Sequence, residues 1–243
     1  MNYQEEIISG NLMVSFNMEI TPIAKIITGF NDKFGIPRQS CIVPESTGKI
    51  VFEGRFRNPD AIRGLEEFSH IWVIWQFSES IEKEPGLMVR PPKLGGNIKV
   101  GVFASRSPFR PNHLGLSCLK LESIETGKSD SPALLVSGVD MLNGTPIYDV
   151  KPYVPMADCH ADASEGYTSR TAKCRLEVVF PDSLAEMIPH DKREELKNLL
   201  SLDPRPGYKI TDGEIFGMPY GRFDIRFTVS NGVLTVKQIV GND

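Results

Sequence analysis

The sequence predicts a mainly β protein, namely an antiparallel β-barrel followed by a small α+β domain at the C-terminal end. Three observations predict it. Seven apolar or alternating runs rich in Val, Ile and Phe lie between residues 18 and 180. Turn-forming Gly, Pro and Asn residues separate these runs, as in barrels and sandwiches. No Gly-x-Gly-x-x-Gly stretch follows a strand, which disfavours a dinucleotide-binding α/β fold.

The bulk composition fits one large folded domain with a small appendage. The 243 residues are 40% hydrophobic and 24% charged, which is ordinary for a globular protein. No apolar run approaches the roughly 18 residues of a membrane helix, and the N-terminus has acids where a secretory signal has positive charge. We therefore expect a cytoplasmic protein without membrane contact.

The strands are expected in a continuous series after an N-terminal extension of residues 1–17. The seven runs cover residues 18–30, 49–56, 70–77, 98–104, 116–125, 133–141 and 174–180. In the third run, Trp72 and Trp75 differ by three positions, so they face opposite sides of the strand. We expect one of these tryptophans in the core and the other at an interface. The barrel domain is thus assigned to residues 18–180.

Residues 181–243 are predicted to form the C-terminal α+β domain. Asp191 and Glu194 have the spacing of a capping box at the start of a helix, and Pro204 ends that helix. One helix face is apolar and consists of Leu196, Leu199 and Leu200. Further along, Asn231-Gly232 between two alternating runs predicts a β-hairpin.

A basic segment stands out in a chain with a net charge of −4. Residues 87–120 contain six Lys and Arg and no acid. The six are Arg90, Lys93, Lys99, Arg106, Arg110 and Lys120. Such a segment fits a local site for a polyanion such as nucleic acid, and it fits a loop that pairs with acids on its own surface almost as well.

Within this segment, residues 101–117 carry the most informative motif. Pro108 and Pro111 fix the backbone of a loop, and Arg106 and Arg110 lie four positions apart on it. Guanidinium groups bind phosphate and carboxylate in a forked manner. The alternative is a structural loop whose arginines pair with nearby acids, and the residues alone do not separate the two.

Three further segments contain candidate site residues. The turn at 35–39 offers a cation and an amide, although such pentapeptides are commonly plain surface turns. Ser69-His70 stands at the start of an apolar strand, where a histidine acts as a general base or, more often, as a structural hydrogen-bond donor. Residues 138–155 contain two acids and two tyrosines, which are Asp140, Asp149, Tyr148 and Tyr153.

The cysteines and the acidic loop give no reason to expect a metal site. Cys41, Cys118, Cys159 and Cys174 are widely spaced and form no Cys-x-x-Cys pair, which favours free thiols. The stretch Asp-Cys-His-Ala-Asp at 158–162 has no second set of ligands at a recognised spacing. We interpret it as a solvated loop.

Six blocks of the sequence, taken together and in order, resemble the TsaA-like, TrmO-type family of tRNA methyltransferases. They are PRQ at 37–39, RGLEEFSHIWV at 63–73, RPPKLGGN at 90–97, GVFASRSPFRPN at 101–112, NGTPIYDVKPYVP at 143–155 and DPRPGY at 203–208. The resemblance implies a homodimeric β-barrel enzyme with a small C-terminal domain and S-adenosylmethionine as methyl donor. It also implies a tRNA substrate, N6-threonylcarbamoyladenosine at position 37 beside the anticodon, methylated at N6.

The resemblance further implies which residues contact the cofactor. These are Pro37, Arg38, Gln39, Ser69, His70, Arg106, Leu116, Asp140, Met141, Leu142 and Asn143. The chain departs from the family pattern at His113-Leu114, where Pro-Ile is frequent, and at Asn143, where Asp is common. The second departure removes a carboxylate and puts the cofactor contact at Asn143 in question.

A mechanism follows as a hypothesis, because the sulfonium methyl needs mainly an aligned nucleophile. Arg106 or Arg110 would hold a carboxylate or phosphate of the substrate, and His70, Asp140 and Tyr148 are candidate proton acceptors. Two alternatives remain. One is a methyltransferase of the same fold with another substrate, and the other is a non-catalytic module that binds S-adenosylmethionine or RNA.

Overall fold

The computed structural model describes residues 3–8, 11–16, 19–81, 85–91, 94, 98–170, 175–205 and 213–241, with the backbone alone for the first two ranges. Several features singled out in the sequence lie outside the described residues. They are Lys93 and Gly95-Gly96 of the RPPKLGGN block, Cys174, and the last three residues of the DPRPGY block. No helix in the described ranges has the length and apolar character needed to cross a membrane.

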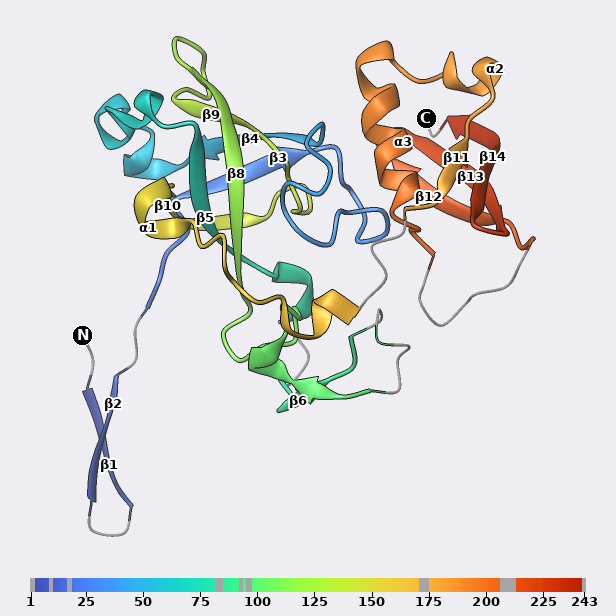
Figure 1. Cartoon of the computed structure of the whole chain (residues 1–243). Helices are drawn as coiled ribbons and strands as arrows, with labels where there is room; N and C mark the ends of the chain where they lie inside the picture. The colour runs from blue at the N-terminus through green and yellow to red at the C-terminus, as the bar shows by residue number, and fades with distance from the viewer. Residues whose placement is uncertain are drawn as a thin grey trace.

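Six strands close into an antiparallel barrel in the order β10-β3-β4-β9-β8-β5 (Figure 1), which confirms the predicted fold class. The barrel strands are β3 (Ala24–Thr28), β4 (Thr47–Phe52), β5 (His70–Gln76), β8 (Leu114–Glu125), β9 (Ala133–Ser137) and β10 (Pro146–Pro152). All six pairings are antiparallel. Closure leaves no barrel strand with an unpaired edge.

Strand β10 was not among the predicted strands, although it closes the barrel between β3 and β5. This strand has proline at both ends and polar residues at its centre. It was not predicted because proline within a run argues against a strand. The structure places Pro146 and Pro152 at the strand termini, and the register shifts between Ile147 and Asp149. Only Ile147 of this strand is fully buried.

Inward side chains of the strands, which alternate strictly on β5, fill the barrel with largely aliphatic groups. On β5, Ile71, Val73 and Trp75 point inward, and His70 and Trp72 point outward. This confirms that the two tryptophans occupy opposite faces. The inward side chains pack with those of the other strands into one core, which includes Ile26, Ile50, Leu119, Leu134, Val136 and Met141.

Short elements connect the barrel strands. Between β4 and β5 lie three 3-10 turns, η1 (Gly54–Phe56), η2 (Pro59–Ile62) and η3 (Leu65–Glu67), and η4 (Ser78–Ser80) follows β5. The run at 98–104 contributes only the short strand β7 (Val100–Gly101), paired with β6 (Met88–Val89), before η6 (Val102–Ala104) begins. After β10 come α1 (Pro155–Asp158) and η7 (Gly166–Arg170). At the N-terminus, β1 (Tyr3–Ile8) and β2 (Asn11–Phe16) form a separate two-stranded sheet.

The C-terminal part is a four-stranded sheet in the order β11-β14-β13-β12, with α2 (Asp182–Ala185), η8 (His190–Lys192) and α3 (Arg193–Ser201). Its strands are β11 (Glu177–Val179), β12 (Phe216–Tyr220), β13 (Phe223–Ser230) and β14 (Val233–Gly241). The run at 174–180, expected with the barrel, therefore supplies β11, which pairs in parallel with β14. The hairpin at Asn231-Gly232 is confirmed, and both residues have positive φ.

The predicted helix begins one residue later than the capping pattern suggests. Lys192 is the N-cap of α3 without a side-chain cap, because Asp191 belongs to the 3-10 turn η8, so the capping-box prediction is wrong. The apolar face is confirmed, since its three leucines are buried. Asp203, at a φ of 54°, turns the chain away after the helix.

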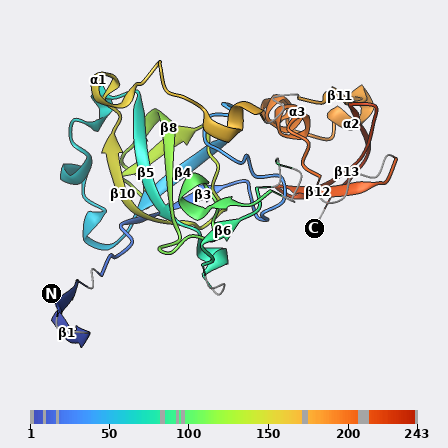
Figure 2. The same cartoon turned by 60° about the horizontal axis from the view of Figure 1, so that its bottom comes forward.

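The long loop between β3 and β4 connects the two halves of the molecule. Figures 1 and 2 show this blue segment reaching from the barrel toward the C-terminal sheet. Phe30 and Val43, at its two ends, are buried in the same hydrophobic cluster as Leu196, Phe216 and Met218. The loop thus contributes side chains to the core of the C-terminal sheet.

Candidate active site

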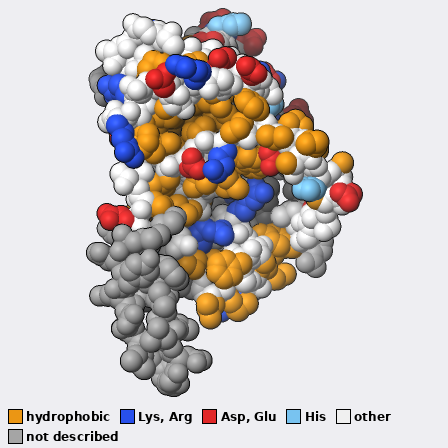
Figure 3. Space-filling view, turned by 90° about the vertical axis from the view of Figure 1, so that its left-hand side faces the viewer, with side chains coloured by type: hydrophobic (Ala, Val, Ile, Leu, Met, Phe, Trp, Pro, Cys, Tyr) orange, Lys and Arg blue, Asp and Glu red, His pale blue; other side chains and the backbone are white. Residues whose placement is uncertain are grey.

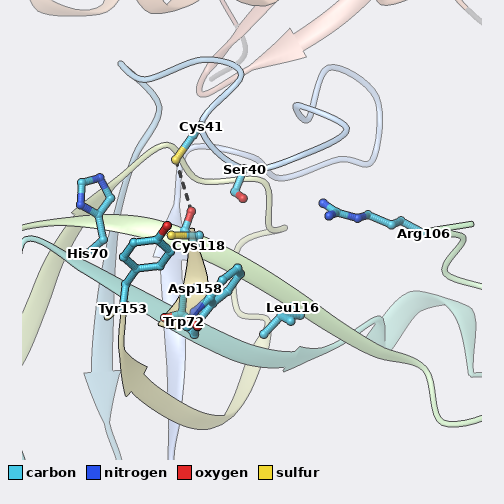
Figure 4. A pocket seen from close by; sticks show the side chains of 9 residues that line it. All are labelled: Ser40, Cys41, His70, Trp72, Arg106, Leu116, Cys118, Tyr153 and Asp158. Atoms are coloured by element: carbon cyan, nitrogen blue, oxygen red, sulfur yellow. Dashed lines mark hydrogen bonds between the residues drawn. The ribbon is translucent and has the colours of Figure 1, made fainter. Parts of the chain in front are cut away.

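A pocket of about 530 Å³ lies on the outer surface of the barrel (Figure 4). Four of its lining residues come from the outward faces of β5 and β8, Asp158 comes from the end of α1, and the others come from loops. The nine lining residues are Ser40, Cys41, His70, Trp72, Arg106, Leu116, Cys118, Tyr153 and Asp158. Because the barrel interior is filled by its own side chains, the outer face is the surface that remains for a ligand.

The floor of the pocket is aromatic. The antiparallel register sets Trp72 opposite Cys118, and both side chains therefore point to the same outward face. The ring of Tyr153 lies 5.8 Å from that of Trp72 and 6.1 Å from that of His70, between ring centroids. On the histidine, Nδ1 lies 2.9 Å from the Ser69 hydroxyl, which leaves the other ring nitrogen to face a ligand.

One wall is the turn that contains the PRQ block. Pro37 is buried, Arg38 is exposed, and Cys41 adopts a positive φ of 61°. The Cys41 amide donates to the Gly138 carbonyl over 2.9 Å, and its thiol donates to the Cys118 carbonyl over 3.2 Å. A Cβ on Gly138 would lie only 3.1 Å from the Cys41 backbone, so glycine there permits this close approach.

The two arginines of the proline-rich loop have different surroundings. Arg106 lines the pocket and donates from Nη1 to Oε1 of Gln39, which brings together two blocks that are 67 residues apart. Arg110 is not among the lining residues and donates to the Ser105 carbonyl within its own loop over 3.2 Å. The structure therefore places Arg106, rather than Arg110, at the pocket.

A buried hydrogen-bond chain leads from the barrel core to the pocket wall. The Trp75 indole donates to the Ser117 hydroxyl over 2.9 Å, and Ser117 donates to Oδ1 of Asp140 over 2.7 Å. Burial raises the pKa of the Asp140 carboxyl from 3.8 to about 6, against the opposing effects of Ser117, of backbone amides including that of Ser40, and of the Arg106 charge. Asp140 is thus a carboxyl that titrates near neutral pH beside the pocket.

The rest of the predicted turn at 140–143 is tied to the barrel. Met141 is buried in the barrel core, and its carbonyl accepts from the Thr28 hydroxyl over 3.2 Å. The Leu142 carbonyl accepts from the Thr145 hydroxyl over 2.7 Å. Asn143 accepts the Thr28 amide over 3.1 Å through its side-chain oxygen. These contacts hold the turn that carries Asp140.

Tyr148 lies away from the pocket. Its hydroxyl donates to Oε1 of Gln76 over 2.8 Å, at the opposite end of β5 from His70. Six residues of extended strand separate Gln76 from His70, which is about 20 Å at roughly 3.3 Å per residue. The structure thus does not bring Tyr148 and His70 together within one subunit.

Sequence reasoning missed several residues of this region. Ser40, Cys41, Trp72, Cys118 and Asp158 line the pocket and were not among the expected site residues, whereas Tyr153 was a candidate without an assigned cofactor contact. Trp72 and Cys118 share the outward periodicity of His70 and Leu116, so alternation alone could have identified them. Ser117 was harder to identify from the sequence. Its only distinguishing feature is that it is a polar residue at an inward position of β8, where the other inward positions are mostly apolar.

Comparison with known proteins gives consistent matches along the chain. Residues 25–159 match the family model of the tRNA-methyltransferase O N-terminal domain, and residues 173–242 match that of the TrmO C-terminal domain. The tRNA (adenine(37)-N6)-methyltransferase of Escherichia coli K12 is 35% identical over 229 residues, which are 90% of this chain and 95% of that protein. The protein of the same name from Eikenella corrodens is 40% identical over 174 residues, covering 71% of this chain and 97% of that protein.

A solved structure agrees with these matches. The crystal structure of TrmO from Pseudomonas aeruginosa superimposes with a TM-score of 0.75 at 30% identity, and the match covers 94% of this chain and 99% of that one. Family models, relatives and fold thus agree over both the barrel and the C-terminal sheet. The chain therefore belongs to the tRNA-methyltransferase O (TrmO) family, which its ordered sequence blocks resemble.

Proposed function

We propose that this protein transfers a methyl group from S-adenosylmethionine to N6 of the adenosine at position 37 of tRNA, in the form of N6-threonylcarbamoyladenosine. The names of its relatives and the pocket both support this function. The observation that carries the proposal is that His70 and Arg106 line one pocket, while Gln39 is bonded to Arg106 and Asp140 lies close enough to feel its charge, although all four are far apart in the sequence.

The residues present fit the cofactor. A volume of about 530 Å³ is within the range of roughly 300–1,000 Å³ that is usual for small-molecule sites. The faces of Trp72 and Tyr153 and the Asp140 carboxylate suit a ligand with two positive centres. S-adenosylmethionine, when bound, supplies an activated methyl group on its sulfonium.

The side chains around the pocket have distinct proposed roles. Arg106 binds an anionic group of the substrate, either the threonyl carboxylate or a phosphate, and its bond to Gln39 orients it. His70 is the proposed proton acceptor, because its Nδ1 is held by Ser69 and the ring faces the pocket. Arg110 supports the loop instead, and Tyr148 has no proposed role in catalysis because its hydroxyl is bonded to Gln76 at the far end of β5.

The proposal also covers the domain boundaries and the oligomeric state of the protein. We propose an extension of residues 1–17, a cofactor-binding barrel that begins at residue 18, and a C-terminal domain that begins at β11 (Glu177–Val179) rather than at residue 181. We further propose a cytoplasmic homodimer. Large hydrophobic side chains are exposed around β6, β7 and the proline-rich loop, notably Leu87, Ile98, Phe103 and Leu116. Figure 3 shows such side chains spread over one face of the molecule, with Lys and Arg between them.

The test begins with tRNA nucleosides from cells that lack the gene. We expect mass spectrometry to show loss of the methylated threonylcarbamoyl nucleoside and its return with the wild-type gene. In single-turnover assays on purified modified tRNA, Arg106→Ala is expected to lose most of the methyl transfer. Lys25→Ala, on an exposed ion pair of the barrel, serves as the matched control.

Two outcomes would contradict the proposal. Unchanged methylation by Arg106→Ala would remove that side chain from the site. If the wild-type protein binds S-adenosylmethionine and tRNA but transfers no methyl group, it is a binding module rather than an enzyme.

A further inference from the structure

We propose that the C-terminal domain is part of the cofactor site, because it fixes the conformation of the turn at residues 37–41, with Arg175 as a positioning residue. The inference rests on the proposed function in one respect, namely that this turn contacts the cofactor. It assigns to the C-terminal sheet and helix a role in small-molecule affinity.

The hydrophobic contacts of the β3–β4 loop carry the first part of the argument. Phe30 and Val43 are buried members of the C-terminal cluster, and Phe34, Ile36 and Ile42 pack against the same cluster. Residues 37–41 are therefore flanked on both sides by side chains anchored in the C-terminal core. The turn that lines the pocket is a short span between these two anchors.

A second contact fixes the first anchor. Gly35 has a φ of +89°, and a Cβ built on it would lie 2.8 Å from the Met218 sulfur in β12. The backbone of the loop thus lies directly on the C-terminal sheet at this point. Glycine satisfies both the left-handed conformation and the close approach.

Arg175 fixes the second anchor. Its Nη2 donates to the Ile42 carbonyl over 2.8 Å, and its Nη1 lies 3.3 Å from Oδ1 of Asn198 and 3.4 Å from the Ser201 hydroxyl on α3. The guanidinium therefore joins helix α3 to the residue that follows Cys41. A charged donor to a backbone carbonyl is among the stronger hydrogen bonds in proteins.

On its other side the same turn is bonded to the barrel. Cys41 donates to the Gly138 carbonyl, and further along the same loop the Ser46 hydroxyl donates to the Val139 carbonyl over 2.9 Å. Gln39 in turn accepts from Arg106. If the loop residues that pack on the C-terminal domain move, the pocket wall at residues 40–41 therefore moves with them, and so does Arg106.

The test uses the full-length protein with Arg175→Ala. We expect the KM and the Kd for S-adenosylmethionine to rise by about five- to tenfold, as for loss of one charge-assisted hydrogen bond. The KM for tRNA is expected to rise by a smaller factor, because the turn reaches the substrate only through the bond between Gln39 and Arg106. Arg175→Lys, which keeps a cationic donor, should recover part of the affinity.

A control on the same domain separates positioning from general damage. Arg226→Ala removes an arginine whose exposed pair with Asp224 faces away from the loop contacts, and it should leave both KM values unchanged. Amide hydrogen exchange should become faster at residues 37–43 in Arg175→Ala and stay unchanged in the control.

Four results are decisive. An unchanged KM for S-adenosylmethionine in Arg175→Ala overturns the inference, and so does an equal loss in the control. If Arg175→Ala fails to fold, Arg175→Lys is compared with the wild type instead. The inference is overturned if Arg175→Lys binds S-adenosylmethionine as tightly as the wild type and shows unchanged amide exchange at residues 37–43. If the wild-type protein does not bind S-adenosylmethionine at all, the proposed function fails instead.

Discussion

Replacing Asp140 with Asn should stabilise the protein and weaken its cofactor binding. The carboxyl accepts a hydrogen bond from Ser117, and burial raises its pKa from 3.8 to about 6. This difference corresponds to about 3 kcal/mol in favour of the neutral group in the folded state. An amide keeps the shape and the acceptor oxygen without a charge to bury, so it avoids most of this cost.

The sign of the effect depends on pH. Well below the ordinary pKa of 3.8 the carboxyl is protonated in both folded and unfolded chains and contributes nothing. Between about pH 4 and 6 the unfolded chain loses the proton first, so the wild-type free energy of unfolding falls. Above about pH 6 the loss is complete, and Asp140→Asn should be more stable than wild type by up to about 3 kcal/mol.

The measurement is urea unfolding of both proteins at pH 4, 5, 6 and 8, together with calorimetric titration of S-adenosylmethionine at pH 6 and 8. We expect the stability difference to grow from pH 4 to 6 and then to level off. Wild-type affinity should be higher at pH 8 than at pH 6, and the variant should bind weakly at both values. A variant no more stable than wild type at pH 8 would refute the reasoning, as would a difference that is independent of pH.

Two further substitutions test the packing beneath the pocket. Gly115→Ala places a Cβ 2.3 Å from Cε2 of Trp75, and overpacking of this kind should lower the free energy of unfolding by about 1–3 kcal/mol or more, measured with urea. Trp75→Phe keeps an aromatic ring but removes the donor to Ser117, and we expect a loss of about 1–2 kcal/mol together with a weaker cofactor affinity. A Gly115→Ala protein as stable as wild type, or a Trp75→Phe protein with unchanged affinity, would contradict the packing described here.

The strands were predictable where burial follows a simple period. On β5 and on the hairpin of β13 and β14, apolar residues alternate because one face is buried, and Asn231-Gly232 permits the tight turn. Strand β10 lacked this signal, since prolines bound it and only one of its side chains is fully buried. The capping-box prediction failed because a 3-10 turn took up Asp191 and moved the start of the helix.

For the site, the sequence blocks indicated which turns matter but not what holds them. Arg106 and Gln39 are hydrogen-bonded although 67 residues separate them. Trp75, Ser117 and Asp140 form a hydrogen-bond chain only because the strand register brings them together. Local patterns do not encode such long-range contacts. The same limit explains Tyr148, whose position next to Gln76 follows from the pairing of β10 with β5 rather than from any motif.

The alternation along β5 has an evolutionary consequence. Odd-numbered positions of this strand lie in the interior and even-numbered ones face outward, with His70 and Trp72 at the pocket. Selection for ligand preference can therefore vary one set of side chains while the other set preserves the fold. In a library with every substitution along this strand, harmful changes at odd-numbered positions should lower protein abundance. Harmful changes at even-numbered positions should lower turnover alone.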